Sequence, residues 1–493
     1  MKLKELLQGL ETTFIKGPVD LEIKNIHYDS RKIAQHGLFV ATTGLTFDGH
    51  DFIDAAKSQG AVAVVVEKEV VAQGMTVIGV KNSKRALSYL SRKFFRDPSK
   101  DLGVMGITGT NGKTTTTYLL ESIYKCAGFV PGVLGTINYR CGKKVWKATH
   151  TTPESYDLQK IFYDLKKEGA THVMMEVSSH ALAQDRVEGI HFDAGIFSNL
   201  TRDHLDFHKN FENYFDAKRS LFTKYLPESQ KKKKTSIINI DDEYGRKLAQ
   251  ELKGKDLVTY GFKQKGGDFS AQDIKITLAG IDMKMVTPQG EFKVKSPLVG
   301  YHNVSNILAA YACAGSLGIK DEYILKGVEK LYSVPGRLEP ISIGKGPSIF
   351  VDYAHTDDAL KNVLQALNAL KKKGKIWTVF GCGGDRDKTK RPLMGKVAES
   401  LSDVVIVTSD NPRTESADSI LEDIKKGMTH IKPTYFEVDR TQAIFFAIEK
   451  AREDDVILIA GKGHETYQIL GKKVIDFDDR QKALKALKKY WDK

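Results

Sequence analysis

The sequence has little of what marks secreted, zinc-bound or membrane-spanning chains. Its 493 residues include only four cysteines, none in a C-x-x-C pair, so we expect neither a disulfide framework nor a structural zinc site. The longest apolar runs, such as residues 61–66, are far shorter than the ~18 residues that a membrane span requires. Lys4, Glu5 and Gln8 interrupt the apolar positions of the first ten residues, which does not fit a signal sequence. These absences predict a cytoplasmic protein without membrane insertion.

What is present is the composition of an ordinary globular chain. Hydrophobic residues make up 41% and charged residues 28%, and at about 150 residues per domain the length predicts roughly three domains. Lys and Arg number 75 against 62 Asp and Glu, and the net charge of +13 favours anionic partners: nucleic acid, a membrane surface or a phosphorylated small molecule. The basic runs at 231–234 and 371–373 are short and lack interleaved aromatics, so they indicate solvated loops and we expect no nucleic-acid partner.

Short apolar, β-branched runs alternate with longer amphipathic stretches, a pattern typical of βαβ units with parallel sheets. The predicted strands are 102–107, 172–177, 194–200, 236–239, 348–353, 376–381, 404–409 and 456–461. Polar clusters follow nearly all of them. Since ligands of open parallel sheets bind beyond the carboxyl ends of the strands, this coincidence predicts an enzyme.

Two breaks divide the chain. The first is Asp97-Pro98, and the second is Val334-Pro335-Gly336, where a predicted helical stretch over 303–331 ends. We therefore predict three α/β domains: a smaller one over 1–97, a central P-loop ATPase-like domain with a parallel sheet over 98–334, and a Rossmann-like domain over 335–493. The last helix, 480–490, spaces its leucines for packing and is assigned no chemistry.

A phosphate-binding loop follows the strand at 102–107. Gly109 and Gly112 let backbone N–H groups approach phosphate, Lys113 adds a charge, and Thr114 opens a helix and offers a hydroxyl to Mg²⁺. The standard G-x-x-x-x-G-K-[ST] loop would need glycine where Ile107 stands, so this is a variant. The alternative is a glycine turn with a surface lysine. The predicted ATP contacts in the loop are Gly109, Thr110, Asn111, Gly112, Lys113, Thr114 and Thr115.

Two further clusters end neighbouring strands. Glu176 begins the run Glu-Val-Ser-Ser-His, and His204 lies in the run 198–206. A carboxylate and an imidazole at adjacent strand ends can bind a metal beside phosphates. From its residue type alone His204 could equally be a capping or core histidine. Lys218, taken alone, is an ordinary exposed helix lysine.

The loop G-T-N-G-K-T-T and these clusters resemble the Mur ligase superfamily, ATP-dependent amide ligases that build the peptide stem of peptidoglycan, with folylpolyglutamate synthetases as distant relatives. The resemblance implies that Thr114, Glu176 and His204 bind Mg²⁺. It also implies that Lys218 is carbamylated by CO₂, which turns a cation into an anionic metal ligand. The catalytic residues it implies are Lys113, Lys218, His204 and Arg337.

The resemblance continues towards the C-terminus. Asn303 lies in a segment similar to the family's adenine contact, Arg337 at the domain junction is similar to its phosphate-binding arginine, and Asp352 is similar to its ribose-side residue. The alternatives are a helix N-cap for Asn303, a salt bridge for Arg337 and a turn for Asp352.

The N-terminal domain is similar to the uridine-binding domain of the member that adds the third residue of the stem, through the motifs 28–31, 37–41 and 44–50. Leu45-Thr46-Phe47 departs from the His-Gln pair common in relatives, and His150 stands where an asparagine is common. An arginine among hydroxyl and amide donors suits a substrate with diphosphate and carboxylate groups. The implied UDP-muramoyl-dipeptide contacts are Tyr28, Ser30, Thr151, Thr152, Ser178, Gln184 and Arg186.

Three motifs follow strands of the C-terminal domain, at 383–387, 410–413 and 461–465. Arg386, Arg413 and Glu465 are expected to place two cations and one anion at the same edge of the sheet. This set would match a zwitterionic ligand that carries one additional carboxylate. Asp-Asn-Pro-Arg resembles the form that selects meso-diaminopimelate, although Asn-Pro-Arg alone could be a solvent-facing turn. The predicted amino-acid contacts are Arg386, Asp410, Asn411, Pro412, Arg413, Gly461 and Glu465.

Together the resemblance implies a monomeric, cytoplasmic enzyme that uses ATP and Mg²⁺ to join meso-diaminopimelate to UDP-N-acetylmuramoyl-L-alanyl-D-glutamate through an acyl phosphate. Such a reaction serves peptidoglycan synthesis and, through it, cell shape and division. Two alternatives stay open: the same chemistry with L-lysine, and a nucleotide-gated binding protein that acts on nucleic acid.

Overall fold

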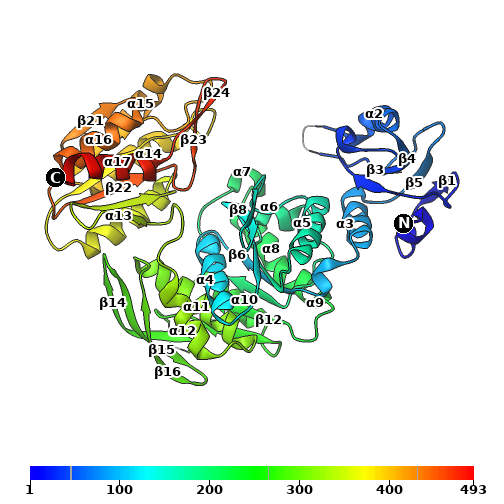
Figure 1. Cartoon of the computed structure of the whole chain (residues 1–493), viewed down its shortest axis with the longest axis horizontal. Coiled ribbons are helices and arrows are strands. Elements are labelled where there is room, and N and C mark those ends of the chain that lie inside the picture. Colours follow the sequence, from blue (N-terminus) through cyan, green and yellow to red (C-terminus); the bar gives the residue numbers. More distant parts are fainter. Residues whose placement is uncertain (45–46, 265, 430, 493) are drawn as a thin grey trace. The chain divides into compact units, whose positions relative to one another are not determined.

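The computed structural model describes residues 1–44, 47–264, 266–429 and 431–492. It is an α/β protein built on three main sheets, as the alternating pattern predicts (Figure 1). The chain divides into two compact units, one of residues 1–270 with 305–327 and the other of residues 271–304 with 328–493. The N-terminal and central sheets both belong to the first unit. The predicted limits 1–97, 98–334 and 335–493 remain predictions.

The N-terminal sheet has five strands in the order β1-β5-β4-β3-β2, and only β1 runs antiparallel to its neighbour. Its strands and helices are α1 (Leu3–Leu7), β1 (Phe14–Lys16), β2 (Asn25–His27), β3 (Gly37–Val40), α2 (Ile53–Ser58), β4 (Ala61–Val66), β5 (Thr76–Gly79) and α3 (Ser83–Phe94). Residues 45 and 46, part of the predicted uridine-side segment, lie outside the described residues.

The central sheet has eight strands in the order β13-β12-β11-β6-β10-β7-β8-β9. The five pairings from β13 to β7 are parallel, and the strands between β13 and β8 read as apolar runs because they are buried on both faces. The elements are β6 (Gly103–Thr108), α4 (Lys113–Cys126), β7 (Pro131–Leu134), β8 (Asn138–Cys141), β9 (Lys144–Lys147), α5 (Ser155–Lys167), β10 (His172–Glu176), α6 (Ser179–Ala183), β11 (Ala194–Phe197), α7 (Leu205–His208), α8 (Phe211–Ser220), a π-helix (Leu221–Tyr225), α9 (Leu226–Glu228), β12 (Thr235–Asn239), α10 (Glu243–Glu251) and β13 (Leu257–Tyr260).

Two features of residues 270–330 differ from the sequence prediction. A three-stranded sheet of β14 (Ser270–Thr277), β15 (Gly280–Thr287) and β16 (Gly290–Ser296) was not predicted, although β15 alternates buried and half-buried residues. The single helical stretch over 303–331 is also wrong. It is two helices, α11 (Tyr301–Ser316) and α12 (Asp321–Lys330), because Gly318 takes the left-handed conformation, with φ of +89°, that ends a helix.

The C-terminal sheet has six strands in the order β17-β18-β22-β19-β20-β21, with β17 antiparallel. One core cluster joins one face to α13–α15 and another joins the other face to α16 and α17, so the sheet is covered on both sides. The elements are β17 (Glu339–Ile341), β18 (Ser348–Asp352), α13 (Asp357–Leu370), β19 (Ile376–Phe380), α14 (Lys390–Leu401), β20 (Val404–Thr408), α15 (Ala417–Lys425), β21 (Thr434–Glu437), α16 (Arg440–Lys450), β22 (Val456–Ala460), the hairpin β23 (Tyr467–Leu470) and β24 (Lys473–Asp476), and α17 (Asp479–Trp491).

Among the described residues, none of the helices is both long and apolar enough to cross a membrane.

Candidate active site

The glycine loop between β6 and α4 is held in a conformation that requires its two glycines. Gly109 has φ of +142° and Gly112 has φ of +89°. A Cβ at Gly109 would lie 1.9 Å from Ser198 Oγ, and one at Gly112 would lie 2.4 Å from Asn306 Oδ1. Ile107 is a fully buried strand residue, so the loop begins after it and position 107 does not need glycine.

Backbone and side-chain hydrogen bonds attach this loop to the segment after β11. Thr110 N–H donates to the Asn199 carbonyl at 2.9 Å, and Asn111 N–H donates to Asn199 Oδ1 at 2.9 Å. Ser198 Oγ donates to the Asn111 carbonyl at 2.6 Å. The two predicted motifs are therefore one structural unit, as expected for neighbouring parallel strands.

Two lysines converge on the loop. Lys113 Nζ donates to the carbonyls of Gly109 and Thr110, both at 2.8 Å, and Lys218 Nζ donates to the Gly109 carbonyl at 3.0 Å. The interpretation of Lys218 as an exposed helix lysine is wrong, because its side chain is 1% exposed. Burial, reinforced by the charge of Lys113, lowers the pKa of Lys218 well below its usual value.

Tyr214 of α8 organises the surroundings of these groups, although the sequence did not single it out. Its hydroxyl is 3.1 Å from Thr110 Oγ1, and Lys218 Nζ lies 4.6 Å from the centre of its ring. The His204 ring centre is 6.3 Å from that of Tyr214. Thr110, His204 and Lys218 are thus brought together around one buried aromatic ring.

Glu176, the last residue of β10, is 1% exposed and its carboxylate is oriented by Thr136. Thr136 donates its N–H to Oε1 and its hydroxyl to Oε2, both at 3.0 Å. A Cβ at Gly135 would lie 2.3 Å from Oε1, so the chain passes close to this carboxylate. Glu176 pairs with Ile107 in the sheet, two residues before Gly109.

The predicted contacts to the muramoyl-dipeptide form a second cluster beside Glu176. Arg186 donates to the Thr152 carbonyl at 3.1 Å and to Gln184 Oε1 at 2.8 Å, and it pairs with Glu154 at 2.8 Å. The buried Thr152 hydroxyl donates to the Glu176 carbonyl and accepts from Ser178 N–H. The Thr152 hydroxyl therefore holds the backbone of Glu176 and Ser178 in position.

The remaining members of this set lie nearby or in the N-terminal domain. Thr151 Oγ1 is 3.0 Å from Thr136 Oγ1, and Ser178 caps α6 by accepting from Ala181 N–H. Tyr28 donates to Asp157 Oδ2 at 2.7 Å, and Ser30 is buried in a 3₁₀ turn.

In the second unit, Asp352 ends β18 with its carboxylate buried. Oδ2 accepts from Leu338 N–H at 2.7 Å and Oδ1 from Ala354 N–H at 2.8 Å, and burial raises the pKa of this carboxyl group. The Arg337 guanidinium lies 5.2 Å from the Tyr353 ring centre. Asn303 is not an N-cap, because α11 begins at Tyr301; its Nδ2 donates to the Val299 carbonyl at 2.8 Å.

The three C-terminal motifs leave the adjacent strands β22, β19 and β20 at one edge of the sheet. Asp410, Asn411 and Pro412 are buried, so the interpretation as a solvent-facing turn is wrong. Arg413 Nη1 donates to the Gly384 carbonyl at 2.7 Å. Gly461 has φ of +112°, and a Cβ there would lie 2.7 Å from Asp410 Oδ2.

The other two predicted contacts differ in exposure. Glu465 Oε2 accepts from Asn411 Nδ2 at 3.0 Å, while Arg386 is exposed and donates to the Asp385 carbonyl at 3.1 Å. The edge therefore presents both charge signs within one set of loops.

Comparison with known proteins accounts for this arrangement. The sequence matches the family models for the Mur ligase family catalytic domain over residues 22–95, the Mur ligase middle domain over 107–314 and the Mur ligase glutamate ligase domain over 336–463. The chain belongs to the Mur ligase family. Its three-domain α/β architecture is thereby confirmed.

Relatives in the family match from end to end. The chain is 44% identical to a UDP-N-acetylmuramoyl-L-alanyl-D-glutamate--2,6-diaminopimelate ligase of Geobacter metallireducens, over 99% of this chain and 98% of that protein. It is 45% identical to the ligase of the same name from Clostridium tetani, over 98% of both. A solved structure with this ligase name has a TM-score of 0.74 at 33% identity and covers 99% of each chain.

Four residues beside the predicted site were not predicted from the sequence: Thr136, Tyr214, Lys462 and Tyr467. Thr136 follows β7 but belongs to no recognisable motif. Tyr214 has the sequence pattern of an ordinary aromatic core residue. Lys462 is fully buried, and its Nζ contacts Asn411 Oδ1 at 3.2 Å and Glu465 Oε2 at 3.0 Å. Tyr467 has Glu465 among its charged neighbours, and burial together with that carboxylate raises the pKa of its hydroxyl. Lys462 lies within the motif 461–465 and Tyr467 lies just after it, so their positions in the sequence could have identified them.

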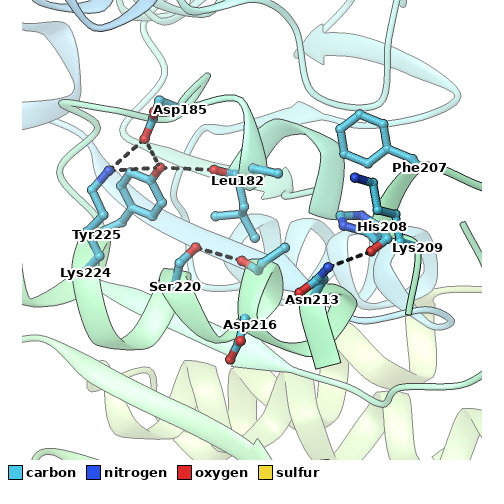
Figure 2. A pocket seen from close by; sticks show the side chains of 12 residues that line it. Leu182, Asp185, Phe207, His208, Lys209, Asn213, Asp216, Ser220, Lys224 and Tyr225 are labelled. Atoms are coloured by element: carbon cyan, nitrogen blue, oxygen red, sulfur yellow. Dashed lines mark hydrogen bonds and ion pairs between the residues drawn. The ribbon is translucent and has the colours of Figure 1, made fainter. Parts of the chain in front are cut away.

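A cavity of about 420 Å³ lies on α6, α7 and α8 (Figure 2). Figure 2 shows Lys224 directed at Asp185, to which it is bound at 2.7 Å, beside Tyr225, which donates to the same carboxylate at 2.8 Å. None of the predicted site residues lines this cavity, so we assign it no part in the site.

The donor set near the glycine loop fits Mg²⁺ only in company with phosphate. Among the described residues no group of three or more His, Cys, Asp or Glu could hold a metal ion. Mg²⁺ at nucleotide sites takes one or two carboxylates and completes its shell with phosphate oxygens and water. The buried carboxylate of Glu176 and the hydroxyl of Thr114 beside the loop therefore fit an ion that arrives with phosphate.

Proposed function

We propose that this protein is an ATP-dependent amide ligase that joins meso-diaminopimelate to UDP-N-acetylmuramoyl-L-alanyl-D-glutamate in the synthesis of the peptidoglycan precursor. The relatives cited above carry the name of this reaction over the whole length of the chain. The observation that carries the proposal is the convergence of Lys113 and the buried Lys218 on the Gly109 carbonyl, at the end of a parallel strand. A cationic Lys113 beside an N–H-rich loop suits a polyanion, and the buried amine of Lys218 lies at the same carbonyl.

The chemistry follows from what these groups can do. The side-chain carboxylate of the D-glutamate attacks the ATP γ-phosphorus and ADP leaves, while Lys113 neutralises the charge that develops on the phosphate. An amine of diaminopimelate then attacks the acyl phosphate, and inorganic phosphate leaves. The proposed ATP contacts are Gly109, Thr110, Asn111, Gly112, Lys113, Thr114, Thr115, Asn303, Arg337 and Asp352.

Mg²⁺ would be held by Thr114, Glu176, His204 and Lys218 as its carbamate, and when bound it supplies charge neutralisation to the phosphates. Thr136 keeps the Glu176 carboxylate turned in one direction. Lys218 suits carbamylation because burial and the charge of Lys113 lower its pKa, so that more of its amine is neutral and able to add CO₂.

The acceptor nucleotide would contact Tyr28, Ser30, Thr151, Thr152, Ser178, Gln184 and Arg186. Diaminopimelate would contact Arg386, Asp410, Asn411, Pro412, Arg413, Gly461 and Glu465. Arg413 supports diaminopimelate over L-lysine, since a guanidinium fork binds the second carboxylate, which lysine lacks. We also propose a cytoplasmic location, because ATP and UDP-linked precursors are cytoplasmic substrates. Action as a monomer is also proposed.

The deciding experiment measures phosphate release from ATP with UDP-N-acetylmuramoyl-L-alanyl-D-glutamate and a panel of amino acids. We expect release with meso-diaminopimelate and little with L-lysine or without an amino acid. Equal use of L-lysine would contradict the amino acid but not the reaction. Release stimulated by nucleic acid in the absence of any amino acid would favour a nucleotide-gated binding protein instead.

A further inference from the structure

A fully buried ion pair lies beneath the loops of the proposed amino-acid site. Arg440 is the first residue of α16 and Asp479 the first residue of α17, and both side chains have no exposed surface. Arg440 Nε donates to Asp479 Oδ1 at 2.8 Å, and Nη2 donates to Oδ2 at 2.7 Å. A bidentate pair of this kind fixes both the position and the plane of the guanidinium.

The same guanidinium also binds the two strand ends from which the site loops leave. Nη2 donates to the carbonyl of Ala460, the last residue of β22, at 2.9 Å. Nη1 donates to the carbonyl of Ser409, the first residue after β20, at 3.3 Å. The next residues along the chain are Gly461 and Asp410, which open two of the three predicted amino-acid motifs.

The sheet by itself does not join these two carbonyls, because β19 lies between β22 and β20. The backbone after β19 passes close to the end of β20, since a Cβ at Gly381 would lie 2.2 Å from the Thr408 carbonyl. The long, forked side chain of Arg440 reaches the carbonyls of both Ser409 and Ala460, on either side of β19. A cation at a helix N-terminus is repelled by the positive end of the helix dipole. The helix α16 itself therefore gives no reason for an arginine at position 440.

We infer that Arg440, oriented by Asp479, is a positioning residue that sets the spacing between the loop of Asp410–Arg413 and the loop of Gly461–Glu465, and thereby the affinity for the amino-acid substrate. This inference rests on the proposed function of those loops. Arg440 is buried beneath the loops and acts through their backbone. The Asn411 side chain, which donates to Glu465 across the same gap, would shift with the spacing.

The first test is kinetic. Arg440→Lys keeps the positive charge but loses the fork, and we expect a five- to tenfold higher KM for meso-diaminopimelate with KM for ATP changed less than twofold. Asp479→Asn keeps the shape of the carboxylate and should raise the same KM. Arg440→Met, which loses the charge as well as the fork, should raise the KM for meso-diaminopimelate further than Arg440→Lys does.

A matched control separates positioning from a general loss of stability. Ile448 is a fully buried residue on the same helix α16, about two turns from Arg440. Ile448→Ala should lower Tm about as much as Arg440→Lys while leaving both KM values unchanged. If the folded Arg440→Lys and Asp479→Asn enzymes keep the wild-type KM for the amino acid, or if Ile448→Ala raises it equally, the inference is wrong.

The second test needs no substrate and therefore remains informative if the proposed function fails. Amide hydrogen exchange followed by mass spectrometry should be faster in peptides covering 409–413 and 460–465 of Arg440→Lys than in wild type. The same peptides of Ile448→Ala should exchange as in wild type. Unchanged exchange in the Arg440 variant would overturn the positioning role, whereas a wild-type protein that ignores diaminopimelate would overturn only the substrate.

Discussion

At the scale of single residues, Lys218 owes its predicted chemistry to burial. With its pKa lowered first by desolvation and then by Lys113, the neutral amine can add CO₂ to give an anionic carbamate and a released proton. We expect Lys218→Ala to lose at least tenfold in kcat, and acetate to restore part of it by occupying the vacated space. Carbon-13 NMR of wild type in ¹³C-bicarbonate should show a carbamate carbon that the variant lacks.

Lys224 gives the matched control for this rescue. It belongs to the π-helix that follows α8 and is paired with Asp185 and Glu188 beside the cavity of Figure 2. Lys224→Ala should retain activity and gain nothing from acetate. An equal response of both alanine variants to acetate, or full activity of Lys218→Ala, would contradict the carbamate.

Lys113 is expected to serve phosphate and to contribute little to folding. Its ammonium donates to two loop carbonyls, and charge-assisted bonds of this kind are worth roughly 1.5 to 3 kcal/mol each, which in a chain of 493 residues corresponds to only a few degrees of Tm. Lys113→Ala should abolish phosphate release and leave Tm within a few degrees of wild type. Lys125→Ala, at the other end of α4, should keep normal activity; an unfolded or fully active Lys113→Ala protein would refute the assignment.

At the scale of elements, the turn after β7 determines how β10 presents its carboxylate. Thr136 supplies two hydrogen bonds to Glu176, one from its backbone and one from its hydroxyl. Thr136→Val keeps the shape but removes the hydroxyl, and we expect about a tenfold fall in kcat with KM for the amino acid unchanged. Thr136→Ser restores the donor and should retain activity. Equal kinetics for the valine and serine variants would show that the hydroxyl is dispensable.

The loop after β20 should control the choice of amino acid. Diaminopimelate exceeds lysine by one carboxylate, and charge-assisted hydrogen bonds to it are worth roughly 1.5 to 3 kcal/mol each. Arg413→Ala should therefore raise KM for diaminopimelate at least tenfold and leave KM for ATP nearly unchanged. Arg386→Ala, if that residue holds the carboxylate common to both amino acids, should weaken both alike.

The experiment is phosphate release by both variants with diaminopimelate and L-lysine. Lys425→Ala on α15, an exposed position, provides the control. Loss of diaminopimelate use by Arg386→Ala but not by Arg413→Ala would reverse the two assignments.

At the scale of the whole molecule, His27 couples stability to pH. It is 6% exposed, and its Nδ1 accepts N–H from Tyr28 and Asp29, which requires a neutral ring. Burial lowers its pKa to about 4, from an ordinary value of 6.5. The unfolded chain therefore binds a proton that the folded protein excludes, so stability is complete above pH 6.5 and falls as the pH drops towards 4.

The expected loss from His27 is about 2 kcal/mol at pH 5. His27→Asn keeps an acceptor near the Nδ1 position without the titration, so its Tm should fall less between pH 7.5 and pH 5 than that of wild type. Thermal unfolding of both proteins across this range measures the effect. Parallel Tm curves would exclude His27 as the source.

The sequence predicted the fold well where local pattern and tertiary structure agree. All eight predicted strands exist, because buried parallel strands are continuous apolar runs that need no partner to be recognised. The break at Gly318 was missed because apolar spacing continues across it. Charge patterns were less informative: the sequence around Lys218 indicates a surface lysine, whereas the tertiary structure buries it with its amino group over the Tyr214 ring.

What the sequence by itself determined was the α/β class, the variant glycine loop and the polar motifs at the strand ends, since each depends on residues close together along the chain. The tertiary structure alone decided which groups meet. Thr136 reaches Glu176 and Lys218 reaches Gly109 across 40 and 109 positions of sequence, and Arg440 joins two strands that are not neighbours. Such contacts depend on strand order and helix packing, which no local pattern encodes.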